Sequence, residues 1–280
     1  MSFSENLLQL KKQAMAQAGP MFAHIDSIAE ANTLKVLDAM RECQVSEAHF
    51  NTTSGYAYDD IGRSKIEELF AKVFGAERAL VRTNFVSGTH ALATVLFGIL
   101  RPGDKLVSIT GAPYDTMQTV IGYANESPGS LKEFGVLYDE LEMIDGKVDM
   151  AGIAGKITPD TKMVLIQRSR GYSMRNPLTI EEIGAICQEV TKVKPDCICF
   201  VDNCYGAFVD TQEPVQAGAD IMAGSLIKNP GGGVALTGGY IAGKSDLVEL
   251  CSYRLTAPGM GDELGASLAN NRMIFQGFFL

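Results

Sequence analysis

The sequence predicts an α/β fold built on a mainly parallel sheet with helices on both faces. Short β-prone runs alternate with helical runs between residues 79 and 243, a pattern that is typical of parallel strands joined by crossover helices. The predicted strands are apolar throughout, as expected of strands that are covered on both faces. Sheets of this kind bind ligands at the carboxyl ends of their strands. The candidate functional residues should therefore follow the predicted strands.

The order of elements follows from hydrophobic spacing and turn residues. Apolar positions at helical spacing predict two helices, over residues 4–17 and 25–43. A turn-rich loop is predicted at residues 50–63, and a helix at residues 64–74. The strands are predicted at residues 79–83, 105–109, 134–139, 162–167, 197–202, 220–226 and 238–243. The intervening helices are predicted from Ser87, after Tyr114, near Met150 and over residues 180–192.

Composition and charge exclude several classes of protein. The net charge of the 280 residues is −9 and no basic block stands out, which argues against a nucleic-acid or anionic-membrane surface. The longest apolar run, residues 91–100, is far shorter than the roughly 20 residues that span a bilayer. The first residues lack the apolar core of a signal peptide. We expect a cytoplasmic protein with reduced cysteines, in which Cys197 and Cys199 form a buried pair and bind no metal.

Two candidate groups follow the first two strands. Ser87 is a good N-cap, and Gly88 and Thr89 open a helix whose free N–H groups suit a phosphate. The alternative is a capped helix that binds no ligand. Tyr114 follows the next strand beside a proline. Its ring could stack on a flat ligand, or it could fasten the next helix to the sheet.

Three more candidates follow later strands. Asp202 ends a strongly apolar strand, where an uncompensated carboxylate is costly, so it needs a cationic or hydrogen-bonding partner. The alternative is an aspartate that caps a helix or turn. Lys228 follows the run "DIMAGSL" and precedes "NPGGG", with Ser225 three residues before it. Alone, this stretch favours a solvated loop lysine over an amine that holds a cofactor.

Together these residue types match one cofactor. Pyridoxal phosphate needs an anion cradle, an aromatic ring, an acid for its pyridine nitrogen and a lysine for a Schiff base. All four occur in the chain, each at a predicted carboxyl end of a strand. A nicotinamide-binding fold is disfavoured, because no G-x-G-x-x-G follows the first strand. The sequence therefore predicts a pyridoxal-phosphate site.

Six motifs extend this prediction to a family: "SGYAYDDIGR", "VRTNFVSGTHA", "GAPYDT", "QRSRGYS", "FVDNCYG" and "SLIKNPGGG". At these motifs the chain resembles the large domain of fold-type I pyridoxal-phosphate enzymes, which is aspartate aminotransferase-like. More closely, it resembles the methionine gamma-lyase / cystathionine beta-lyase family, in the branch associated with aluminium resistance. The resemblance covers essentially the full chain.

The resemblance implies a role for each candidate. Lys228 would form the Schiff base and Asp202 would pair with the pyridinium nitrogen. The phosphate would be held by Ser87, Gly88, Thr89 and Ser225, and Tyr114 would stack on the ring and act in catalysis. Tyr56 and Tyr58 would reach the site of a neighbouring subunit, which implies a homodimer or homotetramer.

The sequence departs from the resembled family at two places. Arg63 lies five residues after Tyr58, where the better-known lyases have Tyr-x-Arg, so a phosphate role for Arg63 is doubtful. "RSRGYSMRNP" replaces an Asn-Pro motif, so that Arg168 and Arg170 become candidates either for an anionic group or for a structural ion pair.

The domain organisation is also taken from the resemblance. Residues 1–50 are expected to form an N-terminal helical segment, and residues 51–280 the cofactor-binding large domain. The small C-terminal domain that supplies an arginine for the substrate carboxylate is expected to be missing from this chain.

The implied function is a carbon–sulfur lyase that acts on a small sulfur amino acid by β- or γ-elimination. In this mechanism Lys228 removes the Cα proton, and Tyr114 protonates the departing thiol. The alternatives are another fold-type I enzyme, such as an aminotransferase or aldolase, and an inactive fragment that dimerises.

Overall fold

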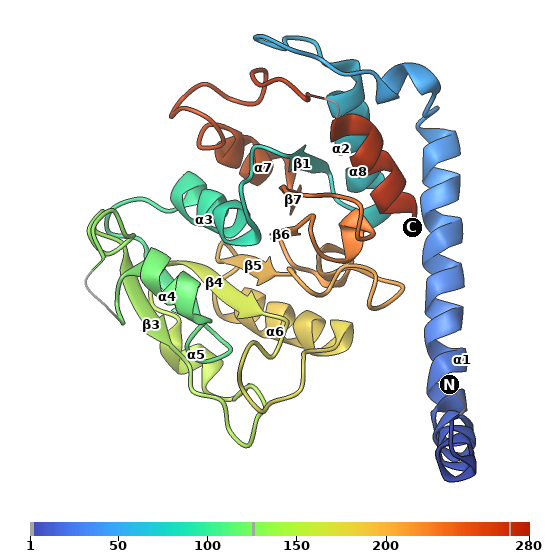
Figure 1. The fold of residues 1–280 in the computed structure, drawn as a ribbon. Helices are drawn as coiled ribbons and strands as arrows, with labels where there is room; N and C mark the ends of the chain where they lie inside the picture. Colours follow the sequence, from blue (N-terminus) through green and yellow to red (C-terminus); the bar gives the residue numbers. More distant parts are fainter. Residues whose placement is uncertain (1–2, 125–126, 269) are drawn as a thin grey trace.

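The computed structural model describes residues 3–124, 127–268 and 270–280. Within these residues, seven strands form one sheet in the order β1-β7-β6-β5-β4-β2-β3 (Figure 1). β7 is antiparallel to β1 and β6, and the other neighbouring strands are parallel. The strands are β1 (Arg78–Arg82), β2 (Lys105–Ser108), β3 (Leu137–Glu140), β4 (Thr161–Gln167), β5 (Ile198–Asp202), β6 (Ile221–Ser225) and β7 (Gly239–Gly243). The predicted mainly parallel sheet is confirmed.

Alternate strand residues pack into two separate cores, one on each face of the sheet. In β5, Phe200 faces the core that includes Leu92 of α3 (Gly88–Ile99), while Val201 faces the core that includes Phe70. The first core is covered by α3, α4 (Asp115–Ile121) and α7 (Ser245–Ser252). The second is covered by α2 (Ile61–Phe74), α6 (Ile180–Val193) and α8 (Asn270–Phe279). Each fully buried large side chain contributes about 1.5–3 kcal/mol to folding. This burial determines which side chains of a strand face each core.

Side-chain caps set where the helices begin. Asp60 accepts the backbone N–H of Arg63 at 2.9 Å and starts α2 three residues before the predicted helix. Thr179 and Glu182 form a capping box at the start of α6, close to the predicted boundary. The helix predicted near Met150 is the short α5 (Ile153–Lys156). Five elements were not predicted from the sequence: α7, α8 and the short 3-10 helices η1 (Glu47–Phe50), η2 (Pro214–Ala217) and η3 (Asn229–Gly231).

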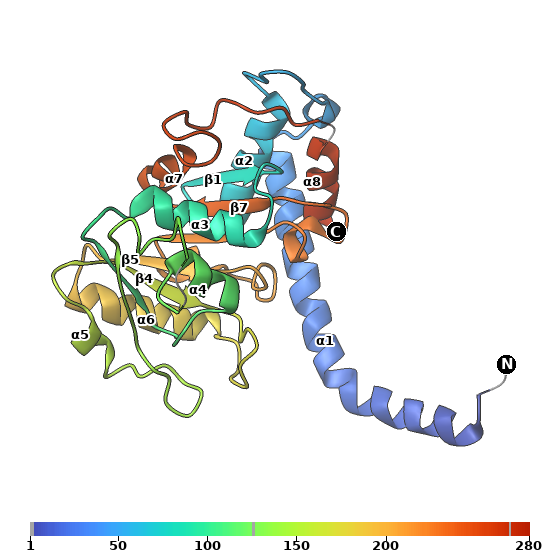
Figure 2. The same cartoon turned by 60° about the vertical axis from the view of Figure 1, so that its left-hand side comes forward.

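The prediction of two N-terminal helices is wrong. α1 (Glu5–Glu42) is one helix with Pro20 inside it, and Figure 2 shows that it changes direction between its N-terminal part and the part that packs on the body. A proline removes one backbone hydrogen bond and bends a helix, which can continue beyond it. Of the described residues of α1, only Asn32, Val36 and Ala39 are buried. Most of α1 is therefore held by its own backbone hydrogen bonds.

The predicted burial of Cys197 and Cys199 is confirmed, and both are free thiols. No group of metal-binding side chains occurs among the described residues. In the same residues, none of the helices combines the length and the apolar character that a membrane span requires.

Candidate active site

The carboxyl ends of three parallel strands form the floor of a cavity of about 880 Å³. Gln167 of β4 pairs with Asp202 of β5, which pairs with Ala223 of β6, so these strand ends lie side by side. The N-terminus of α3 and the loops after β4, β5 and β6 complete the wall. Six predicted site residues line this cavity: Gly88, Thr89, Tyr114, Asp202, Ser225 and Lys228.

Asp202 is a buried carboxylate that has no cationic partner among the described residues. Its Oδ1 accepts the backbone N–H of Cys204 at 3.1 Å, and the Cys204 thiol also donates to it. Burial raises the pKa of Asp202, although these two hydrogen bonds oppose the shift. A carboxylate in this position favours a cation that enters the cavity.

The start of α3 lies against Ser225 and Cys204 with almost no spare room. A Cβ added to Gly88 would come within 2.9 Å of the Cys204 Sγ and 3.0 Å of the Ser225 Cβ. Only glycine therefore leaves the helix N-terminus open to an anion. The Ser87 hydroxyl caps the helix by accepting the His90 N–H at 3.1 Å, and Ser87 is not among the residues that line the cavity.

Tyr114 lines the cavity from the N-cap position of α4. Its hydroxyl lies 3.1 Å from the Thr89 hydroxyl, and its backbone N–H donates to the Gln167 side chain at 3.0 Å. Burial raises the pKa of Tyr114 to about 12. The phenol therefore keeps its proton at neutral pH. Gln167 is the first residue of the motif "QRSRGYS", but no role was predicted for it from the sequence.

Lys228 is half-buried, and its Nζ lies 4.5 Å from the centroid of the Tyr205 ring. An ammonium over an aromatic face is stabilised by the ring quadrupole, which restricts where the amine points. Tyr205 belongs to the quoted motif "FVDNCYG", but the sequence analysis gave it no role. Asp202 and Lys228 thus follow adjacent strands and line one cavity.

Arg168 has a structural role, which is one of the alternatives that the sequence left open. Its guanidinium donates to the Asn203 Oδ1 at 3.0 Å and to the Gly206 carbonyl at 2.8 Å. The buried Glu213 accepts the Asn203 side-chain N–H at 2.9 Å and lies 3.9 Å from the Arg168 guanidinium. This buried network fixes the loop that carries Cys204, whose N–H donates to Asp202.

Tyr56 and Tyr58 do not line the cavity of their own chain. Both are exposed, with ring centroids 6.3 Å apart, at the tip of the loop before α2. The base of this loop is fixed by Arg63, whose guanidinium donates to the carbonyls of Glu263 and Gly265 at 2.8 and 2.6 Å. Arg63 is buried and holds two loops together, which agrees with the doubt about a phosphate role.

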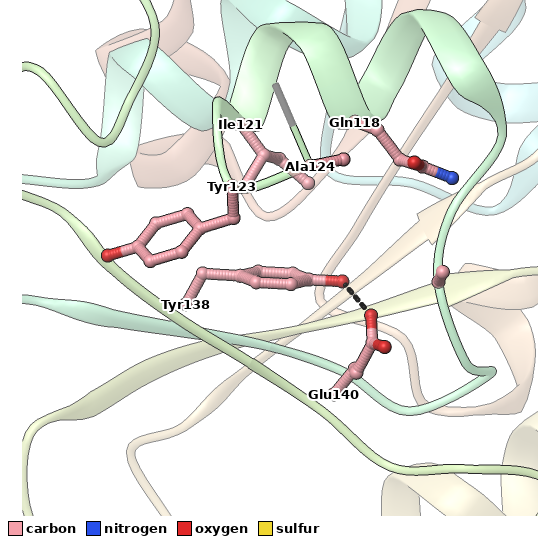
Figure 3. Close-up of a pocket in the computed structure, with 7 residues that line it drawn as sticks. Gln118, Ile121, Tyr123, Ala124, Tyr138 and Glu140 are labelled. Atoms are coloured by element: carbon pink, nitrogen blue, oxygen red, sulfur yellow. Dashed lines mark hydrogen bonds between the residues drawn. The ribbon is translucent and has the colours of Figure 1, made fainter. Parts of the chain in front are cut away.

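A smaller cavity of about 230 Å³ lies between α4 and β3 (Figure 3). In Figure 3 the Tyr138 hydroxyl points to Glu140, to which it donates a hydrogen bond at 2.7 Å. The Tyr123 and Tyr138 rings lie 5.4 Å apart. None of the predicted site residues lines this space, and its main polar pair is already satisfied. The larger cavity is therefore the candidate active site.

Comparison with known proteins agrees with this geometry. The profile of the methionine gamma-lyase family matches residues 7–280. The chain belongs to this family. A Bacillus subtilis protein described as uncharacterized protein YnbB is similar to the chain, with 49% identity over 97% of the chain and 66% of that protein.

Two further comparisons place the chain within the methionine gamma-lyase family. A solved structure from Listeria monocytogenes, described as a candidate cystathionine beta-lyase involved in aluminium resistance, has a TM-score of 0.95 and 53% identity; the match covers 98% of the chain and 68% of that structure. An L-methionine gamma-lyase of Pseudomonas deceptionensis is 25% identical over 77% of the chain and 49% of that protein. The chain thus spans about two thirds of its nearer relatives and half of this lyase.

Proposed function

We propose that the protein is a pyridoxal-phosphate-dependent carbon–sulfur lyase that acts on a sulfur amino acid by β- or γ-elimination. The observation that carries this proposal is that one cavity is lined by the buried Asp202, which has no cationic partner in the described part of the chain, and by Lys228. Membership of the methionine gamma-lyase family supports the same reaction class.

The residues present fit the cofactor. The Asp202 carboxylate suits a protonated ring nitrogen, because that cation would offset the cost of its burial. The backbone N–H groups of Gly88 and Thr89, with the Ser225 hydroxyl, suit the phosphate. Tyr114 suits a stacking contact, and Lys228 would attach the cofactor covalently. When bound, pyridoxal phosphate supplies an electron-accepting ring that stabilises negative charge at the substrate Cα.

The chain itself would move the protons. Lys228 is the base in this proposal, because it follows β6 and lines the same cavity as Asp202. Tyr114 is the proton donor for the departing thiol, since burial keeps its phenol protonated at neutral pH. Thr89 would orient that phenol through the contact between their hydroxyls.

We also propose that the active unit is a homodimer or homotetramer, in which residues 51–280 form the cofactor-binding large domain. Tyr56 and Tyr58 are exposed on a loop whose base is fixed by Arg63, an arrangement suited to contact with a second subunit. Exposed aromatic side chains on a rigid base lose little entropy when they are buried at an interface.

Product analysis tests the proposal. The purified protein is incubated with pyridoxal phosphate and a cysteine thioether, and the solution is assayed for thiol, α-keto acid and ammonia. We expect all three in equal amounts from wild type and none from Lys228→Ala. Aldehyde formation would indicate an aldolase, and transfer of the amino group to an added keto acid would indicate an aminotransferase. Either result would contradict the lyase assignment.

A further inference from the structure

The loop between β4 and α6 carries three arginines, two of which donate hydrogen bonds to the protein. Arg168 donates to the Asn203 side chain and the Gly206 carbonyl. Arg175 donates to the carbonyls of Gln167 and Asn176 at 2.7 and 2.9 Å, and also to that of Ser169. Their donors therefore satisfy acceptors that fix the shape of the loop.

Arg170 differs from both. In the described part of the chain, its guanidinium has no hydrogen-bond or ion-pair partner, and its side chain is exposed. It lines the candidate active site and also an adjoining cavity of about 440 Å³. An arginine presents five N–H donors in a rigid fork, which suits a carboxylate.

The backbone beneath Arg170 is held firmly. The Arg170 carbonyl accepts both the backbone N–H of Ser173 at 3.1 Å and its hydroxyl at 2.7 Å. The Gln167 side chain donates to the Ser169 carbonyl at 3.1 Å, and the Leu178 N–H donates to the Arg168 carbonyl at 2.9 Å. The loop thus presents Arg170 from a fixed turn, which lowers the entropy that ligand binding must overcome.

The charges around the cavity favour an anion near Arg170. The ionisable side chains that line it, apart from the tyrosines and Cys204, are the basic Arg168, Arg170 and Lys228 and the acidic Asp202 and Asp210. The whole chain, by contrast, has a net charge of −9. The adjoining cavity is also lined by Asp115, Glu142 and Arg175. Because Arg175 already donates to loop carbonyls, an anion that contacts Arg170 is expected on the Lys228 side.

We infer that Arg170 binds a carboxylate of the substrate. This inference rests on the proposed function for the nature of the substrate, and it adds a residue that determines specificity. The carboxylate is either the α-carboxylate of the amino acid or a second one on the sulfur-linked group. Arg170 lines the cavity from the loop after β4, while Asp202 ends β5 and Lys228 follows β6.

Binding of unreactive analogues tests the inference without turnover. L-Norvaline and L-α-aminoadipate lack sulfur but match S-methyl-L-cysteine and S-carboxymethyl-L-cysteine in shape, with one and two carboxylates. Calorimetric Kd values are measured for the cofactor-loaded wild type, Arg170→Gln, Arg170→Lys and Arg41→Gln. Arg41 is a matched control because its exposed guanidinium pairs with Asp38 on α1, and it does not line the cavity.

The outcomes separate the two sources of the carboxylate. Loss of a charge-assisted bidentate contact should raise Kd about 10- to 100-fold in Arg170→Gln, with a smaller rise in Arg170→Lys and none in Arg41→Gln. A rise for both ligands assigns the α-carboxylate, and a rise for L-α-aminoadipate alone assigns the distal one. Unchanged Kd values for both ligands in Arg170→Gln would overturn the inference.

A parallel kinetic assay keeps the two proposals distinguishable. With the matching thioethers, KM should rise in Arg170→Gln by the same factor as Kd, while kcat changes less. If wild type binds the analogues but releases no thiol from either thioether, the lyase proposal fails while the Kd comparison still decides the role of Arg170.

Discussion

The side-chain oxygen of Gln167 accepts the backbone N–H of Tyr114 at 3.0 Å, which ties the end of β4 to the start of α4. Gln167 also pairs with Asp202 in the sheet, so one residue connects Tyr114 to the strand that carries Asp202. Replacing Gln167 with Leu should leave the Tyr114 N–H without a partner and destabilise the protein by about 1–3 kcal/mol. Thermal unfolding of Gln167→Leu measures this loss. Equal melting temperatures for Gln167→Leu and wild type would contradict the assignment.

Because Gly88 lies close to Ser225, we expect Gly88→Ala to weaken the binding of pyridoxal phosphate more than it weakens folding. Gly88→Ala places a methyl group 2.9 Å from the Cys204 sulfur, at the N–H groups that we assign to the phosphate. Its affinity for pyridoxal phosphate should fall at least about tenfold, measured by equilibrium dialysis. Gly155→Ala is the control, because a Cβ there meets nothing within 4 Å. The same affinity for Gly88→Ala and Gly155→Ala would argue against this phosphate site.

Asp202 should make the stability of the cofactor-free protein depend on pH. Burial raises its folded-state pKa above the ordinary value of 3.8, so the folded protein holds this proton more tightly than the unfolded chain. Stability from this group is then lost as the pH rises from about 4 through the folded pKa. The melting temperature of Asp202→Asn relative to wild type should therefore increase between about pH 4 and pH 7.

The exposed Asp196 provides the matched control for that titration. Lys194 lowers the pKa of Asp196, so removing its charge should have a small effect of the opposite sign. Scanning calorimetry of both variants over the pH range checks the prediction. The prediction concerns the melting temperature of Asp202→Asn minus that of wild type. If this difference stays constant or shrinks as the pH rises, burial does not raise the pKa of Asp202.

The loop tip should matter for assembly and activity but not for the fold of one subunit. Tyr58→Ala removes a side chain that is 58% exposed, so the melting temperature of the single subunit should change little. Sedimentation should show weaker association, and activity should fall with it. Phe134→Ala, another exposed aromatic that lies away from this loop, is expected to leave both unchanged. Normal association and activity of Tyr58→Ala would remove this loop from the proposed interface.

The layers of the fold and the floor of the site followed from local patterns. The apolar run that ends at Asp202 and the one before Lys228 are strands, as predicted, and the structure pairs them as neighbours in the sheet. What sequence patterns could not supply was long-range pairing. Arg63 and Arg168 are satisfied by carbonyls and by Asn203, far away in the sequence, and no local pattern encodes such partners. The break predicted between residues 17 and 25 is absent, because α1 continues through Pro20, and a proline can bend a helix without ending it.

Covalent labelling at Lys228 tests the central claim most directly. The protein is incubated with pyridoxal phosphate, reduced with borohydride and digested, and the modified peptide is identified by mass spectrometry. The account predicts one stoichiometric cofactor adduct, on Lys228, which is absent from Lys228→Ala. An adduct distributed over surface lysines such as Lys11 and Lys147, and unchanged in Lys228→Ala, would contradict it.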